Sequence, residues 1–179
     1  DGRTIKFENV RPYVLFVGTL EPRKNLPRLI KAFLDCSLPN HDLIIAGHKG
    51  WGNITVPKHS NLKWLSPQTD AELASLYSAA AFVAAPSLYE GFGLQVAEAL
   101  AFGKAVITSN TSALPEVAGN AALYVDPNSS ADISRSISKL ATDHILRKQL
   151  ESNAKVRAQT FSWDRTVDQT VSVFESLLR

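Results

Sequence analysis

The chain has 179 residues, of which 45% are hydrophobic and 20% are charged. This is the composition of an ordinary globular protein of one domain, and it excludes disordered, collagen-like and coiled-coil chains. Lysine and arginine together number 19 and aspartate and glutamate 17. The resulting net charge of +2 gives no reason to expect nucleic acid or an anionic membrane as a partner.

The predicted elements alternate between short apolar runs and segments of helical periodicity. The first elements in chain order are a strand over 13–18, a helix after Asn25, and strands over 42–47 and 62–65. A helix then follows a capping box of Thr69 and Glu72, and after it comes a strand over 81–85. The next elements are an apolar and therefore buried helix over 94–102, and strands over 105–108 and 121–125. Helices follow over 131–140, with Ser130 as the cap, over 143–157 and over 163–178.

Apolar runs of this kind suit a parallel sheet that is covered by helices on both faces. We therefore expect an α/β fold, namely a Rossmann-like, doubly wound parallel sheet of about six strands over residues 11–179, behind a linker over 1–10.

Three features of the sequence bear on the cellular compartment of the protein and on whether the sequence is part of a longer chain. Cys36 is the single cysteine, so an internal disulfide is excluded, which fits a reducing compartment such as the cytoplasm. The apolar runs are far shorter than the roughly 18 residues of a membrane span. The sequence begins at Asp1 and contains no methionine, so we expect a piece of a longer protein.

A first candidate binding segment follows the first predicted strand. Ligands of open parallel sheets bind beyond the carboxyl ends of the strands. There Gly18 and Thr19 allow close backbone approach, and Arg23 and Lys24 place two cations before the next helix. Such a pair suits a phosphate or diphosphate. The alternative interpretation is a solvated turn with incidental basic residues.

A second candidate segment follows the strand over 81–85. Gly91 and Gly93 flank an aromatic residue where a helix begins, so backbone N–H groups are accessible to an anion. Glu98 is the lone charged residue of that helix, and buried carboxylates are costly unless paired. Together with Glu90, it could hold the two ends of a nucleotide sugar, with the diphosphate between them. Either glutamate alone is more simply a salt-bridged structural residue.

The segment from Glu90 to Glu98 resembles the Glu-x7-Glu signature of retaining glycosyltransferases of family 4. Further segments resemble the C-terminal domain of that family, and they are Gly18-Thr19 with Pro22-Arg23-Lys24-Asn25, Ile45-Ala46-Gly47, Pro86-Ser87 with Glu90-Gly91-Phe92-Gly93-Leu94, and Leu114-Pro115-Glu116-Val117-Ala118-Gly119. The resemblance extends over about residues 13–179.

The resemblance implies the C-terminal half of a two-domain GT-B glycosyltransferase, in which this half binds the nucleotide-sugar donor. Arg23 and Lys24 would bind the diphosphate and stabilise the leaving nucleotide, and Glu90 would face the donor sugar. The catalytic residues carried over are thus Arg23, Lys24 and Glu90, and the donor-binding residues are Gly18, Thr19, Phe92, Gly93, Leu94 and Glu98.

The implied reaction transfers a hexose from a nucleotide-diphosphate sugar to a glycan or lipid-linked acceptor, with retention of configuration. No cofactor is implied, and because the sequence lacks an Asp-x-Asp motif and a His/Cys ligand cluster, we expect no metal. The basic loop also resembles that of bacterial enzymes that build surface polysaccharides, some of which use GDP-mannose. Peripheral attachment of a full-length enzyme to the inner face of the membrane stays open.

The acceptor-binding N-terminal domain of that family is missing from these residues. We therefore expect the isolated chain to bind donor but to transfer sugar poorly, and its last helix to pack against the missing domain. The alternatives are a nucleotide-sugar epimerase or phosphorylase of the same architecture, and a non-catalytic nucleotide-binding or interaction domain. A dinucleotide-dependent oxidoreductase is disfavoured, because the first strand leads into Gly-Thr-Leu-Glu-Pro rather than Gly-x-Gly-x-x-Gly.

Overall fold

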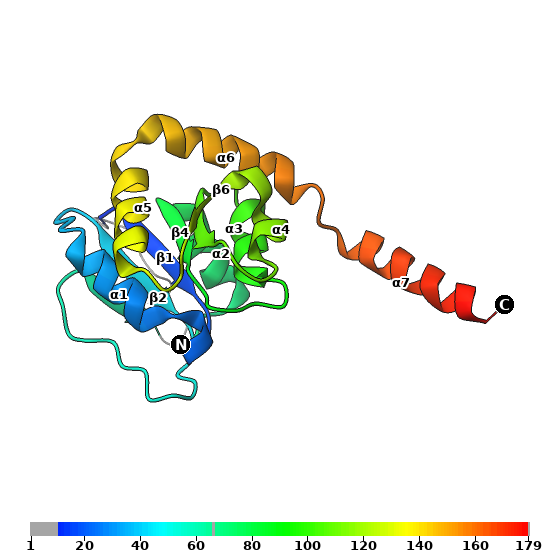
Figure 1. Ribbon diagram of the computed structural model, residues 1–179, viewed down its shortest axis with the longest axis horizontal. Coiled ribbons are helices and arrows are strands. Elements are labelled where there is room, and N and C mark those ends of the chain that lie inside the picture. Colours follow the sequence, from blue (N-terminus) through cyan, green and yellow to red (C-terminus); the bar gives the residue numbers. More distant parts are fainter. Residues whose placement is uncertain (1–10, 66, 179) are drawn as a thin grey trace.

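A computed structural model describes residues 11–65 and 67–178 of the chain (Figure 1), so the linker predicted over 1–10 lies outside the described residues. The described chain forms a parallel sheet with the strand order β3-β2-β1-β4-β5-β6. The strands are β1 (Tyr13–Val17), β2 (Asp42–Ala46), β3 (Leu62–Leu65), β4 (Phe82–Ala85), β5 (Val106–Ser109) and β6 (Ala122–Val125). The predicted doubly wound sheet is confirmed, with each strand within one residue of its predicted bounds.

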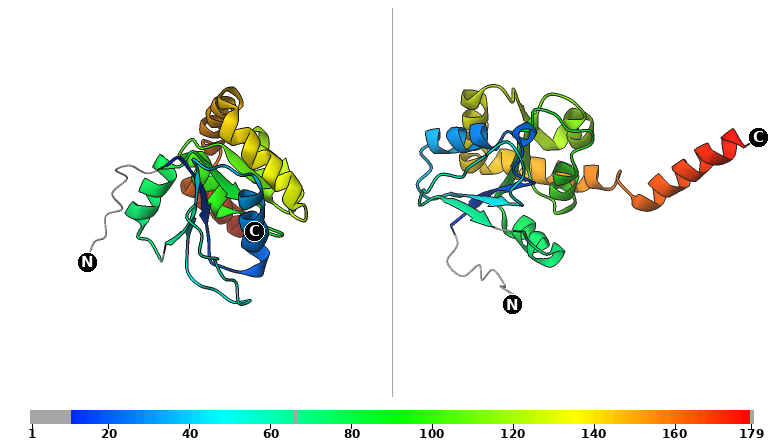
Figure 2. Two further views of the ribbon diagram at one scale, coloured as in Figure 1. Left: turned by 90° about the vertical axis from the view of Figure 1, so that its left-hand side faces the viewer. Right: turned by 90° about the horizontal axis from the view of Figure 1, so that it is seen from below.

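Helices cover both faces of this sheet, as two views at right angles show (Figure 2). The helices are η1 (Pro22–Lys24) and η2 (Gly119–Ala121), both 3₁₀, and α1 (Leu26–Asp35), α2 (Asp70–Ala79), α3 (Leu94–Ala101), α4 (Leu114–Ala118), α5 (Ser130–Thr142), α6 (His144–Ala158) and α7 (Trp163–Leu177). Helices α1 and α5 pack together on one face, and α2, α3 and α4 lie on the other. Because both faces are covered, alternate residues of each strand enter two separate cores, as Phe16 and Leu15 of β1 do.

The caps fix where several helices begin. At α2, Thr69 accepts from the backbone N–H of Glu72 and Glu72 accepts from that of Thr69, so the predicted capping box is confirmed. The predicted cap of α5 is wrong by one residue. Ser129 has the extended backbone of a cap and its side chain accepts from Asp132 N, whereas Ser130 is already helical.

Helix α3 is buried on one face rather than all round. Val96, Ala99 and Leu100 enter the core, whereas Leu94 is 57% exposed and Glu98 is half-buried. The N-terminus of α3 lies at the carboxyl edge of the sheet, beside the loops that follow β1 and β4.

Helix α7 extends away from the rest of the molecule (Figure 1), and none of its described residues is buried. Trp163, Val167, Val171 and Phe174 recur at helical spacing and are all exposed. The helix is thus amphipathic with an uncovered apolar face. That it packs against a further domain stays a prediction.

Candidate functional site

The loops after β1 and β4 meet at the point where the winding of the sheet reverses. These two strands are hydrogen-bonded neighbours, with Val14 opposite Phe82. The chain that leaves β1 continues into α1 on one face of the sheet, whereas the chain that leaves β4 continues into α3 on the other face. Such a switch point leaves a crevice beyond the carboxyl ends of the strands, which is where open α/β sheets bind ligands. The loops are joined directly, because the N–H of Leu88 donates to the carbonyl of Arg23 over 2.7 Å.

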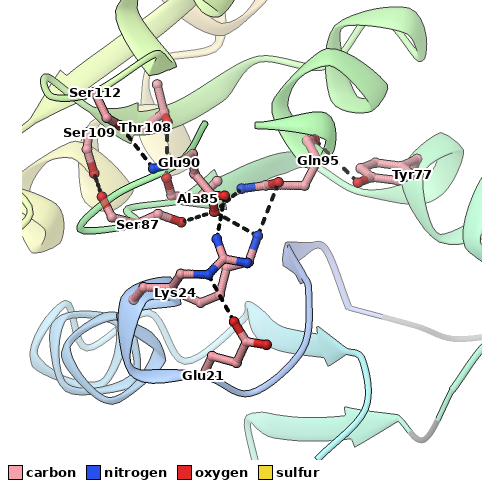
Figure 3. A network of polar contacts seen from close by, with 11 residues as sticks. Glu21, Lys24, Tyr77, Ala85, Ser87, Glu90, Gln95, Thr108, Ser109 and Ser112 are labelled. Atoms are coloured by element: carbon pink, nitrogen blue, oxygen red, sulfur yellow. Dashed lines mark hydrogen bonds and ion pairs between the residues drawn. The ribbon is translucent and has the colours of Figure 1, made fainter. Parts of the chain in front are cut away.

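A cluster of charged side chains, here called the ion cluster, lies where the two loops meet (Figure 3). Lys24 Nζ lies 2.7 Å from Glu90 Oε1, and Arg23 Nη1 lies 2.6 Å from Glu90 Oε2. Lys24 and Glu90 are buried, with side chains 10% and 7% exposed, whereas the Arg23 side chain is 43% exposed and also pairs with Glu21. The two cations and Glu90, predicted from separate segments, are therefore brought together.

Two further residues complete this cluster, and sequence reasoning missed both. Ser87 Oγ donates to Glu90 Oε1 over 2.8 Å, and Gln95 Nε2 donates to the same oxygen over 3.0 Å. Gln95 Oε1 in turn accepts from Lys24 Nζ at 3.4 Å. The signal in the sequence that could have revealed Gln95 is its polar side chain among the apolar residues of α3, two positions after Gly93.

These contacts keep Glu90 ionised. Burial raises the pKa of Glu90, but hydrogen bonds from Lys24 and Ser87, the Lys24 charge and the Gln95 amide together outweigh it. The pKa of Glu90 therefore lies below its ordinary value. At neutral pH the carboxylate is an acceptor, and it offsets one of the two positive charges of Lys24 and Arg23.

Two glycines allow the loop after β1 to lie where it does. Gly18 has φ +147, and an added Cβ would lie 3.3 Å from Lys24 Cε, so the lysine stem passes directly beside it. At Gly47, after β2, an added Cβ would lie 2.1 Å from the carbonyl oxygen of Gly18. The methyl of Thr19 points to a different neighbour, since it lies beside Gly50. Thr19 thus lines the loop after β2, while Gly18 adjoins the ion cluster.

Asn25 fixes the loops relative to one another. It adopts the left-handed conformation (φ 62) and is buried at the start of α1. Its Nδ2 donates to the carbonyls of Pro86, after β4, and Pro127, after β6, over 2.8 and 2.7 Å. Asn25 therefore connects three loops at one edge of the sheet.

The N-terminus of α3 is open beside the cluster. Gly93 starts the helix with φ +98 and no side chain caps it, so its first N–H groups are accessible to an anion. Phe92 packs edge-on against Phe161, with ring centroids 5.6 Å apart, and this contact holds the glycine loop from the side. Leu94 is exposed next to them.

Glu98 lies one turn further along α3 and has a different partner. The hydroxyl of Tyr77 donates to Glu98 Oε2 over 2.7 Å. Burial, and then the charge and hydrogen bond of Glu98, raise the pKa of Tyr77, so its hydroxyl stays protonated and remains a donor. The buried ring of Tyr77 stacks on Phe102 at 5.3 Å. Glu98 is thus oriented by α2 and keeps acceptor capacity for a ligand.

Elsewhere on the described surface, two shallow hollows lie along α1. One lies against residues 55–57 and the other against residues 59–61, and no residue of the ion cluster lines either. Among residues 11–65 and 67–178, no group of three or more His, Cys, Asp or Glu residues is placed to hold a metal ion. None of the helices within these residues has the length and apolarity needed to cross a membrane.

Residues 3–157 match the family model of the group 1 glycosyl transferases. The chain belongs to this family. This group 1 glycosyltransferase domain is 34% identical over 175 residues to O-antigen chain mannosyltransferase B of Escherichia coli, covering 92% of this chain and 46% of the relative. It is 32% identical over 189 residues to a D-inositol 3-phosphate glycosyltransferase of Salinispora tropica, covering 92% and 38%.

Solved structures share the fold. Anabaena HepE in complex with UDP-glucose matches with a TM-score of 0.81 at 22% identity, covering 93% of this chain and 49% of that one. Sucrose-phosphate synthase of Thermosynechococcus elongatus matches with a TM-score of 0.79 at 25% identity, covering 94% and 46%. The chain therefore spans less than half the length of these relatives. The predicted glycosyltransferase is confirmed at the level of the family, and the group 1 domain has the predicted fold.

Proposed function

We propose that this chain is the donor-binding domain of a retaining family 4 glycosyltransferase that transfers a hexose from a nucleotide-diphosphate sugar to a glycan or lipid-linked acceptor. The observation that carries the proposal is the cluster of Arg23, Lys24 and Glu90 at the switch point, beside the open N-terminus of α3. Glycosyl transfer from such a donor leaves negative charge on the diphosphate. Fixed cations and helix N–H groups stabilise that charge.

The diphosphate would lie between the basic pair and α3. An ammonium has three N–H donors, and Lys24 directs two of them to Glu90 and Gln95, so one remains. The half-exposed guanidinium of Arg23 keeps further donors. Because protein groups supply this positive charge, we propose that transfer needs no metal.

The two glutamates would hold the two sugar rings of the donor. Glu90 Oε2 accepts from Arg23 and has acceptor capacity left for a hydroxyl of the hexose. Glu98, oriented by Tyr77, would accept from the ribose hydroxyls. Gly93 and Leu94 would contribute backbone N–H groups between them.

In the transfer step, the bond between the anomeric carbon and the phosphate oxygen breaks, and its electron pair stays on the nucleoside diphosphate. The sugar passes through an oxocarbenium-like state. The oxygen of the acceptor hydroxyl bonds to the anomeric carbon on the departing face, which retains configuration, and the hydroxyl proton passes to the departing phosphate oxygen. Arg23 and Lys24 would act here by stabilising the departing diphosphate, so their effect is largest on the rate of transfer.

The names of several relatives favour a mannosyl donor. O-antigen chain mannosyltransferase B and the serotype-specific mannosyltransferase WbdA, both of Escherichia coli, are 34% and 30% identical to this chain. GDP-mannose is therefore the first donor to test. We propose that the acceptor site, and any attachment to a membrane surface, reside in parts of a longer enzyme.

Calorimetric titration of the chain tests the proposal. GDP, UDP and ADP and their common hexose conjugates would be titrated without metal and then with Mg²⁺. We expect saturable binding of one nucleotide without Mg²⁺, which Glu98→Ala and Arg23→Ala abolish. Arg135→Ala is the matched control, because Arg135 is an exposed arginine paired with Asp132. Binding by none of the nucleotides to a folded sample would contradict the proposal. An epimerase would instead convert the bound sugar without any acceptor.

A further inference from the structure

Gln95 contacts both members of the buried ion pair from the first turn of α3. Its Nε2 lies 3.0 Å from Glu90 Oε1, and its Oε1 lies 3.4 Å from Lys24 Nζ. The side chain is buried, and Figure 3 shows its amide group facing Glu90. The amide thus bridges a cation and an anion that also contact each other at 2.7 Å.

The hydrogen-bonding capacity of the pair is nearly used up by these contacts. Glu90 Oε1 accepts from Lys24, Ser87 and Gln95, so this oxygen has no lone pair left. Glu90 Oε2 accepts from Arg23 and has one lone pair left. Lys24 has one N–H left. One donor and one acceptor therefore remain available, and both belong to the cluster at the switch point.

A neutral amide is well suited to this position. An apolar side chain would leave one Lys24 N–H without a partner in a buried place and would remove one donor from Glu90, so both side chains could then rotate away from this arrangement. A carboxylate would accept from Lys24 but could not donate to Glu90, and it would bring a second negative charge beside the first. Only a group that donates and accepts without charge satisfies both partners.

The backbone of Gln95 lies beside Tyr77 as well. Its carbonyl oxygen lies 3.3 Å from the hydroxyl of Tyr77, which lies 2.7 Å from Glu98 Oε2. Tyr77 is fully buried on α2. The Tyr77 hydroxyl has a single hydrogen and Glu98 is its nearer acceptor, so this hydroxyl orients Glu98 and its contact with the Gln95 carbonyl is the weaker one.

We propose that Gln95 is a positioning residue of the donor site, which holds Lys24 and Glu90 so that one N–H faces the diphosphate and one carboxylate lone pair faces the sugar. This inference rests on the proposed function. Gln95 acts through Lys24 and Glu90 and does not itself touch the donor, so its removal changes diphosphate binding only while Lys24 is present.

A double-mutant cycle measures that dependence. The variants are Gln95→Met, which preserves side-chain size, Lys24→Met and the double variant. Each would be titrated with whichever of GDP, UDP and ADP the wild-type chain binds, and with the matching monophosphate, which lacks the second phosphate. We expect Gln95→Met to weaken diphosphate binding about tenfold and monophosphate binding by less than about twofold. The double variant should bind no more weakly than Lys24→Met. Gln149→Met, at an exposed glutamine of α6, is the matched control.

Gln95→Glu supplies a second and independent readout. The charged and titratable groups around the new carboxyl are Lys24, Arg23, Glu90, Tyr77 and Glu98. Two adjacent carboxyl groups cannot both ionise easily, so one of them has a raised pKa. A protonated carboxyl donates and accepts as the amide does. We therefore expect diphosphate binding by Gln95→Glu, measured relative to the wild-type chain at each pH, to recover as the pH falls from 8 to about 5. Gln95→Met should show no recovery.

The outcomes separate this inference from the proposed function. If the wild-type chain binds none of GDP, UDP and ADP, both are overturned, since there is no donor site to position. If the wild-type chain binds one of these nucleotides and Lys24→Met weakens that binding, the proposed function stands. Additive losses in the double variant, equal losses for mono- and diphosphates, or no recovery of Gln95→Glu in acid would then overturn the role of Gln95 alone. Circular dichroism of each variant confirms that it is folded.

Discussion

The guanidinium of Arg23 and the carboxylate of Glu90 lie 2.6 Å apart, although 67 residues separate them along the chain. The contact forms because β1 and β4 are neighbours at the centre of the sheet and their loops leave it at the same edge. Without a ligand, Glu90 neutralises part of the positive charge of Arg23 and Lys24. A bound diphosphate would therefore share these cations with Glu90.

Removal of the charge of Glu90 should destabilise the fold. Glu90→Gln leaves the buried ammonium of Lys24 without its anionic partner, and breaking such a pair costs about 3 kcal/mol. Urea unfolding of the wild-type chain and the variant measures the loss. Glu116→Gln, at an exposed glutamate, should change the free energy of unfolding by less than about 0.5 kcal/mol. Equal effects of the two substitutions would show that the ion pair contributes nothing to stability.

The contribution of Glu90 should disappear in acid. Its pKa is lowered in the folded chain, so the stabilisation is complete above the unfolded value, about 4.3, and is lost as the pH falls through the lower folded value. The difference in unfolding free energy between wild type and Glu90→Gln should therefore shrink between pH 6 and pH 3. A difference that is constant over this range would mean that the carboxylate is not preferentially ionised in the fold.

Two glycines at the edge of the site should differ in how much stability is lost when each is replaced by alanine. At Gly47 an added Cβ would meet the carbonyl oxygen of Gly18 at 2.1 Å, so the backbones after β1 and β2 must separate. At Gly91 nothing lies within 4 Å of an added Cβ. We expect Gly47→Ala to cost more than about 2 kcal/mol and Gly91→Ala less than about 0.5 kcal/mol, measured by thermal unfolding. A tolerated Gly47→Ala would argue against the close approach of the loops.

Asn25 can be compared with a second asparagine in the same conformation. Asn25 and Asn53 both have positive φ, but Asn53 is exposed. Asn25→Ala leaves the carbonyls of Pro86 and Pro127 without their donor and should cost about 2–4 kcal/mol more than Asn53→Ala, which measures the backbone strain alone. Chemical unfolding gives both values, and equal losses would mean that strain and not hydrogen bonding explains the effect.

Tyr77 should affect the nucleoside end of the donor and not the phosphates. Tyr77→Phe removes the hydroxyl that orients Glu98, and we expect about fivefold weaker GDP binding with unchanged binding of inorganic pyrophosphate. Competition titrations with the two compounds test this. An equal loss for both would place the effect on the fold of α3 rather than on Glu98.

Local patterns were enough to predict much of this architecture. The apolar runs gave each strand to within a residue, and the glycine and charge patterns pointed to the loops that carry Arg23, Lys24 and Glu90. The cap of α5 was placed one residue late because adjacent serines have equal capping ability, and only the backbone decides between them.

The partners of Glu90 could not be predicted in the same way. Gln95 and Ser87 have no local signature of a site, and they matter because the sheet brings their loops to the cations. The role of Asn25 depends likewise on carbonyls after β4 and β6, which are distant in sequence. Contacts of this kind follow from the order of the strands, which local periodicity does not specify.

We propose that the loops after β1 and β4 together bind the diphosphate of a nucleotide sugar. Backbone amide NMR shifts of the 19.5 kDa chain, recorded as GDP-mannose, GDP, UDP or ADP is added, test this binding directly. We predict that the largest changes lie within residues 18–24 and 90–98 and are lost in Lys24→Met. Changes centred instead on α1 and residues 55–57, or no change with any of the four compounds, would contradict binding at these loops.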